Sequence, residues 1–185
     1  MIELTIDTSD AMEAFGAVLA SQLGAGDLVL LNGELGAGKT TLTRGLGAAL
    51  GVRGAVTSPT FVLARTHPRT SGAPLVHVDA YRLSSAVELD DLDIDFENSI
   101  VVVEWGAGLL DGLTDDWLEI GIVRPRGASV PEFIEGALRD GGVAASSGTD
   151  SPTPEVLEGA EPRFVTIEGH GQRWQDLGWV GAARN

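Results

Sequence analysis

The residue types best suited to chemistry are gathered in one short segment, GELGAGKT at residues 33–40. It has a glycine, four further residues, a second glycine, and then a lysine and a hydroxyl side chain. Glycines at this spacing let consecutive backbone N–H groups approach one anion, because no Cβ atom obstructs them. In loops of this kind the lysine reaches the β- and γ-phosphates of a nucleotide, and the hydroxyl ligates Mg²⁺.

The spacing therefore predicts a site for Mg·ATP. The expected phosphate contacts come from the consecutive residues Gly36, Ala37, Gly38, Lys39, Thr40 and Thr41. Lys39 is expected to bridge the β- and γ-phosphates as a catalytic residue, Thr40 to ligate Mg²⁺, and Thr41 to contact the α-phosphate. Composition argues against an accidental match, since Lys39 is the only lysine among the 12 basic residues.

A site of this kind also needs a carboxylate at the end of a buried strand to hold Mg²⁺ or its waters. Glu104 follows the apolar run at residues 100–103, and Asp79 follows the run at residues 75–78. We expect Glu104 to be a metal ligand and Asp79 to contact a water or a switch segment, both as catalytic residues. The alternative for each is a solvated strand end. His77 shares a strand face with Asp79, so it either orients Asp79 or is a structural histidine.

Three further features have two interpretations each. Trp105 is either a core residue or a lid beside the site. Thr60 either senses the γ-phosphate, as a switch threonine does, or belongs to a plain turn. The acidic run at residues 91–95 imitates the start of a calcium loop but has Phe96 in place of the required glycine. It is better interpreted as a solvated acidic face or a surface for a basic partner.

Hydrophobic periodicity predicts the elements that position these residues. Strands are expected at residues 2–6, 27–32, 61–66, 75–79, 100–105, 117–123 and 164–167, with 117–123 as an outer strand. Helices are expected at residues 10–23 with Asp10 as the cap, from the glycine-rich segment to Gly51, and from Ser85 to Leu92. Apolar strands separated by helices predict an α/β protein with a three-layer P-loop NTPase fold, in which helices flank a mixed, mainly parallel sheet.

Charge and composition limit the function. The 27 acidic against 12 basic residues give a net charge of −15. Such a surface repels phosphate backbones, so a basic partner, or a partner that itself carries nucleic acid, fits better than direct nucleic-acid binding. The absence of cysteine excludes disulfides and thiolate metal sites. We find neither a signal-peptide pattern nor an apolar run of the ~20 residues a membrane span needs, so we expect a cytoplasmic protein without a membrane partner.

The segment from residue 126 to residue 162 differs in amino-acid composition from the rest of the chain. It is rich in Gly, Ala, Ser, Pro and Glu, and buries too little apolar surface to offset the entropy cost of ordering it. Strand patterning resumes at residue 164. The expectation is one domain over residues 1–185, interrupted by a flexible low-complexity insertion at 126–162.

Four segments in this order resemble the TsaE family of bacterial ATPases, which act in the tRNA threonylcarbamoyladenosine pathway. They are GELGAGKTT at residues 33–41, SPTF at 58–61, HVDAYRL at 77–83 and VEW at 103–105. The segment GHGQRW at residues 169–174 resembles the end of the family's chains. Two features depart from the family: Gly-Ala-Gly follows Trp105 where an acidic residue is common, and the 126–162 insertion is longer than the family needs.

The resemblance implies a P-loop ATPase that binds a complex of TsaB and TsaD and supports their repeated turnover through its ATP cycle. Contact with tRNA would be indirect, through that complex. By position, Lys39 and the loop bind phosphates, Thr40 and Glu104 hold Mg²⁺, and Asp79 supports hydrolysis. Ser9 and Asp10 lie where the family places the adenine base.

Rival functions stay open. A small-metabolite P-loop kinase would need an acceptor pocket and an arginine-bearing lid. The only lid-sized segment, residues 126–162, contains just Arg126 and Arg139. A non-hydrolysing ATP-dependent adaptor would use the same loop without releasing phosphate. A Ras-like GTPase is disfavoured, because its guanine-recognition motif requires a second lysine.

Overall fold

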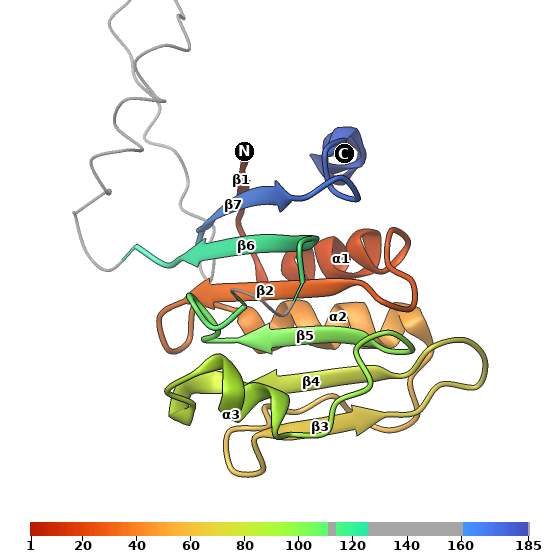
Figure 1. Ribbon diagram of the computed structural model, residues 1–185. Coiled ribbons are helices and arrows are strands. Elements are labelled where there is room, and N and C mark those ends of the chain that lie inside the picture. Colours follow the sequence, from red (N-terminus) through yellow and green to blue (C-terminus); the bar gives the residue numbers. More distant parts are fainter. Residues whose placement is uncertain (111–113, 126–160, 185) are drawn as a thin grey trace, which may run out of the picture.

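A computed structural model describes residues 1–110, 114–125 and 161–184 of the chain. Its strands form a single seven-stranded sheet in the order β1-β7-β6-β2-β5-β4-β3 (Figure 1). The strands are β1 (Ile2–Ile6), β2 (Leu28–Gly33), β3 (Ala64–His67), β4 (Leu75–Asp79), β5 (Ile100–Glu104), β6 (Trp117–Val123) and β7 (Arg163–His170). The helices are α1 (Ser9–Ala20), α2 (Lys39–Leu50) and α3 (Ala86–Asp90), with short 3₁₀ turns η1 (Ala80–Arg82) and η2 (Gly178–Arg184).

The sheet is mixed, as expected. The four middle strands β6, β2, β5 and β4 are parallel to one another. Both margins are antiparallel, through the pairs β1/β7, β6/β7 and β3/β4. The description "mainly parallel" therefore fits the middle of the sheet and not its edges. The prediction that residues 117–123 form an outer strand was wrong, since β6 lies between β2 and β7. Its alternating burial arises because one face is well covered and the other only partly.

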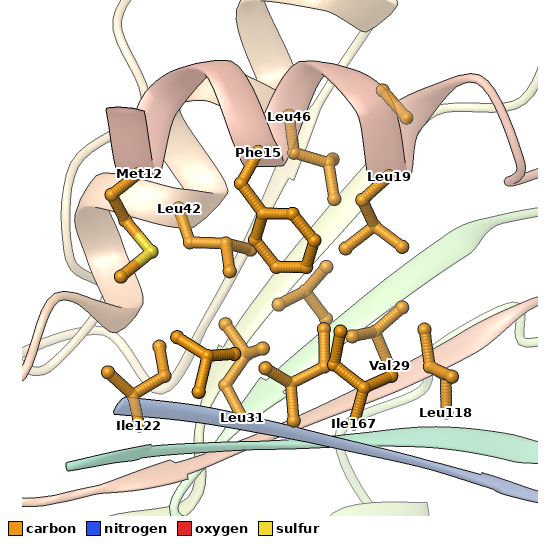
Figure 2. Close-up of a cluster of buried hydrophobic side chains, with 14 of the residues drawn as sticks. Met12, Phe15, Leu19, Val29, Leu31, Leu42, Leu46, Leu118, Ile122 and Ile167 are labelled. Carbon is orange, nitrogen blue, oxygen red and sulfur yellow. The ribbon is translucent and has the colours of Figure 1, made fainter. Parts of the chain in front are cut away.

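The sheet buries both faces, but unequally. Alternate residues of β2 point to opposite sides, so Val29 and Leu31 face α1 and α2, where the larger cluster lies (Figure 2). Leu28 and Leu30 face a smaller cluster, which is closed by α3 and the connections around it. This arrangement gives the predicted three layers, with the short α3 as the only α-helix over the second face among the described residues.

Helices α1 and α2 touch through their backbones. A Cβ atom added at Gly45 would lie 2.0 Å from the carbonyl oxygen of Glu13, and one at Gly16 would lie 2.3 Å from that of Leu42. Only glycine allows so close an approach. The first turn of α2 carries Lys39 and Thr40, so this contact also fixes the start of α2 against its neighbour.

Several element boundaries differ from the predictions. Helix α1 begins at Ser9, and its N-cap is Thr8, not Asp10; the Thr8 hydroxyl accepts from Ala11 N–H at 3.1 Å. The strand expected from residue 61 begins only at Ala64, because the N–H groups at residues 62 and 63 bond back to the Pro59 carbonyl in a turn. Phe61 is consequently 93% exposed.

Other boundaries are confirmed. Ser85 caps α3 as predicted, although the helix ends at Asp90 and not at Leu92. Gly51 ends α2 in the left-handed conformation that suits a helix C-terminus. Most of the predicted insertion, residues 126–160, lies outside the described residues, as do Arg126 and Arg139. Among the helices that are described, none combines the length and the apolar character that crossing a membrane would require.

Candidate functional site

The glycine-rich loop joins β2 to α2 at the carboxyl end of a buried parallel strand. Gly33, Gly36 and Gly38 have φ values of 150°, 79° and 120°, a region that other residues rarely adopt. A Cβ at Gly33 would also lie 2.3 Å from the carbonyl oxygen of Ile122 on β6. Gly38 occupies the N-cap of α2, so the helix N-terminus and its unpaired N–H groups open onto the loop.

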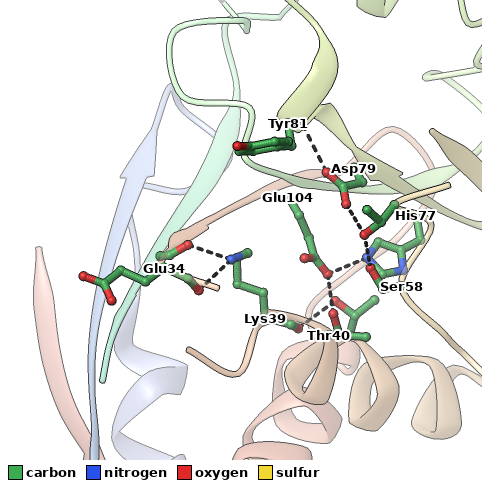
Figure 3. Close-up of polar contacts among 11 residues, drawn as sticks. Glu34, Lys39, Thr40, Ser58, His77, Asp79, Tyr81 and Glu104 are labelled. Atoms are coloured by element: carbon green, nitrogen blue, oxygen red, sulfur yellow. Dashed lines mark hydrogen bonds and ion pairs between the residues drawn. The ribbon is translucent and has the colours of Figure 1, made fainter. Parts of the chain in front are cut away.

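Lys39 lies inside this loop and is 4% exposed. Its Nζ donates to the carbonyl oxygens of Gly33 at 2.6 Å and Glu34 at 3.1 Å (Figure 3). The ammonium also lies 3.7 Å from the centre of the Trp105 ring, a cation–π contact. Burial lowers the pKa of Lys39 below its usual value, although the Glu104 and Asp79 carboxylates act in the opposite direction.

Glu104, the last residue of β5, connects the loop helix to the sheet. Its Oε1 accepts from the Thr40 hydroxyl at 3.0 Å and lies 2.8 Å from His77 Nε2 (Figure 3). Because a carboxylate only accepts, His77 Nε2 is the donor. Of the two interpretations of His77, the one in which it orients Asp79 is wrong. Asp79 lies opposite Glu104 in the strand register, and His77, two residues earlier on the same face, reaches across to Glu104.

Asp79 ends β4 and joins the loop around residues 58–60 to the site. Its Oδ2 accepts from the Thr60 hydroxyl at 2.6 Å, and that hydroxyl lies 2.7 Å from Ser58 Oγ. The Asp79 Oδ1 accepts from the N–H of Tyr81 at 3.1 Å and so begins η1. Thr60 is thus attached to the site through a carboxylate. Its expected role as a γ-phosphate sensor stays a prediction.

Trp105 lies beside the site and takes no part in either hydrophobic core. Its φ of 65° is unusual for a residue with a large side chain, and such strain concentrates at functional positions. The ring meets that of Tyr81 edge-on, with centroids 5.5 Å apart. Of the two interpretations offered above, the structure supports a residue that covers part of the site.

These side chains line one cavity of about 230 Å³. Its walls include every predicted phosphate-binding residue as well as the two predicted carboxylates: Gly36, Ala37, Gly38, Lys39, Thr40, Thr41, Asp79 and Glu104. Leu35, Ser58, Thr60 and Trp105 complete the lining. Ser9 and Asp10 do not line it, but they form the first turn of α1, whose Met12 packs against Gly38.

Arg124, Glu161 and Arg163, which lie beside the loop, were not among the predicted site residues. Arg163 Nε donates to the Ala37 carbonyl at 3.3 Å. The Glu161 carboxylate accepts from Arg124 at 2.6 Å and from Arg163 at 3.2 Å. The hydrogen bond from Arg124 is the main cause of the lowered pKa of Glu161. Local sequence gave no signal for this cluster, because it depends on the pairing of β6 with β7.

The cavity suits a nucleotide with Mg²⁺ on structural grounds. A hydroxyl and a buried carboxylate lie together beside the helix N-terminus, and hard oxygen ligands of this kind are those that Mg²⁺ prefers. Among the described residues, no group of three or more histidine or acidic side chains is placed to hold a metal ion. Mg²⁺ does not require such a group, since it commonly takes one or two protein ligands together with waters and phosphates.

Comparison with known proteins identifies one family. The family described as "Threonylcarbamoyl adenosine biosynthesis protein TsaE" matches residues 6–129. The tRNA threonylcarbamoyladenosine biosynthesis protein TsaE of Streptomyces coelicolor is 49% identical over 167 residues, covering 88% of this chain and 93% of that protein. Its counterpart in Mycobacterium tuberculosis is 53% identical over 119 residues, covering 59% of this chain and 71% of that protein.

The fold is similar to that of a solved structure. The crystal structure of Bacillus subtilis YdiB superposes with a TM-score of 0.65 and 21% sequence identity, covering 98% of this chain and 93% of that one. At this identity the similarity supports the arrangement of strands and helices alone.

Proposed function

The chain belongs to the TsaE family of tRNA threonylcarbamoyladenosine biosynthesis proteins, and from this premise we propose that it is a cytoplasmic P-loop ATPase. It binds Mg·ATP at the loop of residues 33–41 and hydrolyses it, slowly when alone. The hydrolysis supports tRNA modification by the partner proteins TsaB and TsaD, and the chain contacts tRNA only through them.

The observation that carries the proposal is the convergence of three groups on one cavity. Lys39 and Thr40 begin α2 and Glu104 ends β5, yet all three line the same space. The glycine-rich backbone and the α2 N-terminus supply N–H donors on the same side, an arrangement that suits a polyphosphate. Accidental spacing in a glycine-rich chain would not bring a buried carboxylate into contact with the motif's hydroxyl at 3.0 Å.

Each residue then has a definite task. Loop N–H groups bind phosphate oxygens, and the Lys39 ammonium exchanges its two carbonyl partners for the β- and γ-phosphates. Thr40 and Glu104 hold Mg²⁺, which when bound neutralises charge on the phosphates. His77 keeps Glu104 oriented by donating to its carboxylate. Asp79 Oδ2, already a hydrogen-bond acceptor from Thr60, orients the attacking water.

Two surface features support a protein partner. Three exposed apolar side chains belong to the cavity lining or adjoin residues of it: Leu35 in the lining is 82% exposed, Tyr81 in contact with Trp105 is 70% exposed, and Phe61 next to Thr60 in the chain is 93% exposed. Apolar residues exposed next to a site commonly mark a protein contact. The net charge of −15 disfavours direct binding to tRNA and favours a partner that carries the nucleic acid.

The proposal is tested by measuring phosphate release with and without purified TsaB and TsaD. Wild type is expected to release phosphate, and to do so faster with the partners. Lys39→Ala should reduce nucleotide affinity by ~100-fold or more, because it removes the charge that meets the triphosphate, and leave the melting temperature nearly unchanged.

Arg44→Ala serves as the matched control, since it removes a basic residue in the exposed pair Arg44–Glu13 outside the cavity. Unchanged ATP affinity in Lys39→Ala would refute the site. ATP-dependent phosphorylation of a metabolite, without any response to TsaB and TsaD, would favour the kinase alternative. A tight ATP complex that never releases phosphate would favour the adaptor.

A further inference from the structure

Arg163 connects the last strand of the sheet to the glycine-rich loop. It is the first residue of β7, and its side chain is only 15% exposed. The Nε–H donates to the carbonyl oxygen of Ala37 at 3.3 Å, although the two residues are 126 positions apart in the chain. Ala37 is itself completely buried, so its carbonyl has little access to water.

The position of this carbonyl determines where a neighbouring N–H points. The C=O of Ala37 and the N–H of Gly38 belong to one planar trans peptide, so the two groups point in opposite directions. Arg163 holds the carbonyl on the β7 side, and the Gly38 N–H is therefore directed away from Arg163. Gly38 lines the cavity, which places that N–H among the donors available to a phosphate.

Without an anchor this peptide would rotate readily. Gly36 and Gly38 flank Ala37, and glycine populates positive and negative φ almost equally. A flip of the Ala37–Gly38 peptide would turn a carbonyl oxygen toward the bound anion in place of an N–H. The loop therefore benefits from a group outside it that holds one orientation.

Arg163 is in turn held in place by its neighbours. The β6–β7 register pairs Val123 with Phe164, which brings Arg124 and Arg163 close together at the end of the two strands. Glu161 accepts from both guanidinium groups, at 2.6 Å from Arg124 and 3.2 Å from Arg163. The ion pair with Glu161, which Arg124 holds from its other side, limits the rotation of Arg163 and keeps its Nε–H facing the loop.

We propose that Arg163 is a positioning residue for nucleotide binding, which fixes the Ala37–Gly38 peptide so that the Gly38 N–H faces the β-phosphate. The inference rests on the proposed function, because it assumes a nucleotide in the cavity. Arg163 acts through the backbone and not by touching the nucleotide.

The test compares Arg163→Gln, which keeps an N–H donor, with Arg163→Met, which has a similar length and no donor. Arg44→Met is the control at an exposed arginine–glutamate pair. Dissociation constants for ADP and ATP are measured by calorimetry. Arg163→Met should weaken both nucleotides by about tenfold, and equally, because both carry a β-phosphate. Arg163→Gln should stay within about threefold of wild type.

A second measurement does not depend on nucleotide binding. The ¹⁵N order parameter of the Gly38 amide in the free protein should be near 0.85, the value of a rigid backbone, and should fall in Arg163→Met but not in Arg163→Gln. If wild type bound no nucleotide, the proposed function would fail, and the order parameters would still decide whether Arg163 holds the loop.

Three results would overturn the inference. Equal losses of nucleotide affinity in Arg163→Gln and Arg163→Met would show that the charge of Arg163, and not its hydrogen bond to Ala37, supports nucleotide binding. A loss for ATP without a loss for ADP would indicate direct contact with the γ-phosphate. Unchanged affinity and an unchanged order parameter in Arg163→Met would show that the loop needs no anchor. Thermal unfolding of each variant confirms that it is folded at the temperature of measurement.

Discussion

Replacing Gly45 by Ala tests whether α1 and α2 are as close as the structure has them. The added Cβ would lie 2.0 Å from the backbone oxygen of Glu13, whereas real Cβ contacts essentially never fall below 3.0 Å. The helices would have to separate by about 1 Å, a gap that forfeits a quarter to a half of the dispersion energy of each affected atom pair. Because the obstacle is backbone, a side-chain rotation cannot relieve it.

The net effect follows from two opposing contributions. Overpacking in a close-packed interior costs up to about 3 kcal/mol, and the higher helix propensity of Ala returns about 1 kcal/mol. We therefore expect Gly45→Ala to lower the free energy of unfolding by ~2 kcal/mol. Gly47→Ala is the comparison variant in the same helix: its nearest obstacle, at 2.6 Å, is a methyl group of the Val56 side chain and not backbone. That variant should also be destabilised, but less than Gly45→Ala, because a side chain can shift more easily than the backbone of a packed helix.

Urea unfolding of the two variants decides the question, provided that the slope with denaturant is unchanged. A Gly45→Ala variant as stable as Gly47→Ala would refute the close contact of the two helices. If the contact is real, the displaced α2 also carries Thr40 away from Glu104. Gly45→Ala should then bind nucleotide more weakly than Gly47→Ala under conditions in which both are folded.

Two further predictions concern protonation and strain. Burial lowers the pKa of His67 below 6.5, so the unfolded chain takes up the proton first as the pH falls. The free energy of unfolding should therefore decline as the pH drops from 6.5 toward the folded pKa. In unfolding curves recorded at several pH values, His67→Phe should remove this decline. At Trp105, whose φ is 65°, the Gly variant should be more stable than the Ala variant by about 1 kcal/mol in chemical denaturation, the reverse of the order expected at negative φ.

Local sequence was sufficient for the parts of the site that lie close together in the chain. The loop from Gly36 to Thr41 was predicted because its glycine spacing, lysine and hydroxyl are consecutive. Glu104 and Asp79 were found because each follows an apolar run, and the carboxyl ends of parallel strands meet at one edge of the sheet. The buried Glu104–Thr40 contact agrees with that reasoning.

The errors concern contacts that depend on strand order. The partner of His77 is Glu104 because β4 and β5 are neighbours, and the periodicity of a strand does not reveal its neighbour. The contact of Arg163 with Ala37 requires β7 to pair with β6 across residues 126–160, a closure that no local pattern specifies. The placement of residues 117–123 at an edge failed for the same reason.

The order of strands has a consequence for how the chain is completed during synthesis. Among the described strands, β1 has β7 as its only neighbour, so the first strand to be made finds no place in the sheet until β7 has emerged (Figure 1). Until then β6 also has one open edge, and unpaired apolar edges invite aggregation or degradation. A chain that ends before Arg163 therefore leaves β1 without a partner and β6 with an unpaired edge.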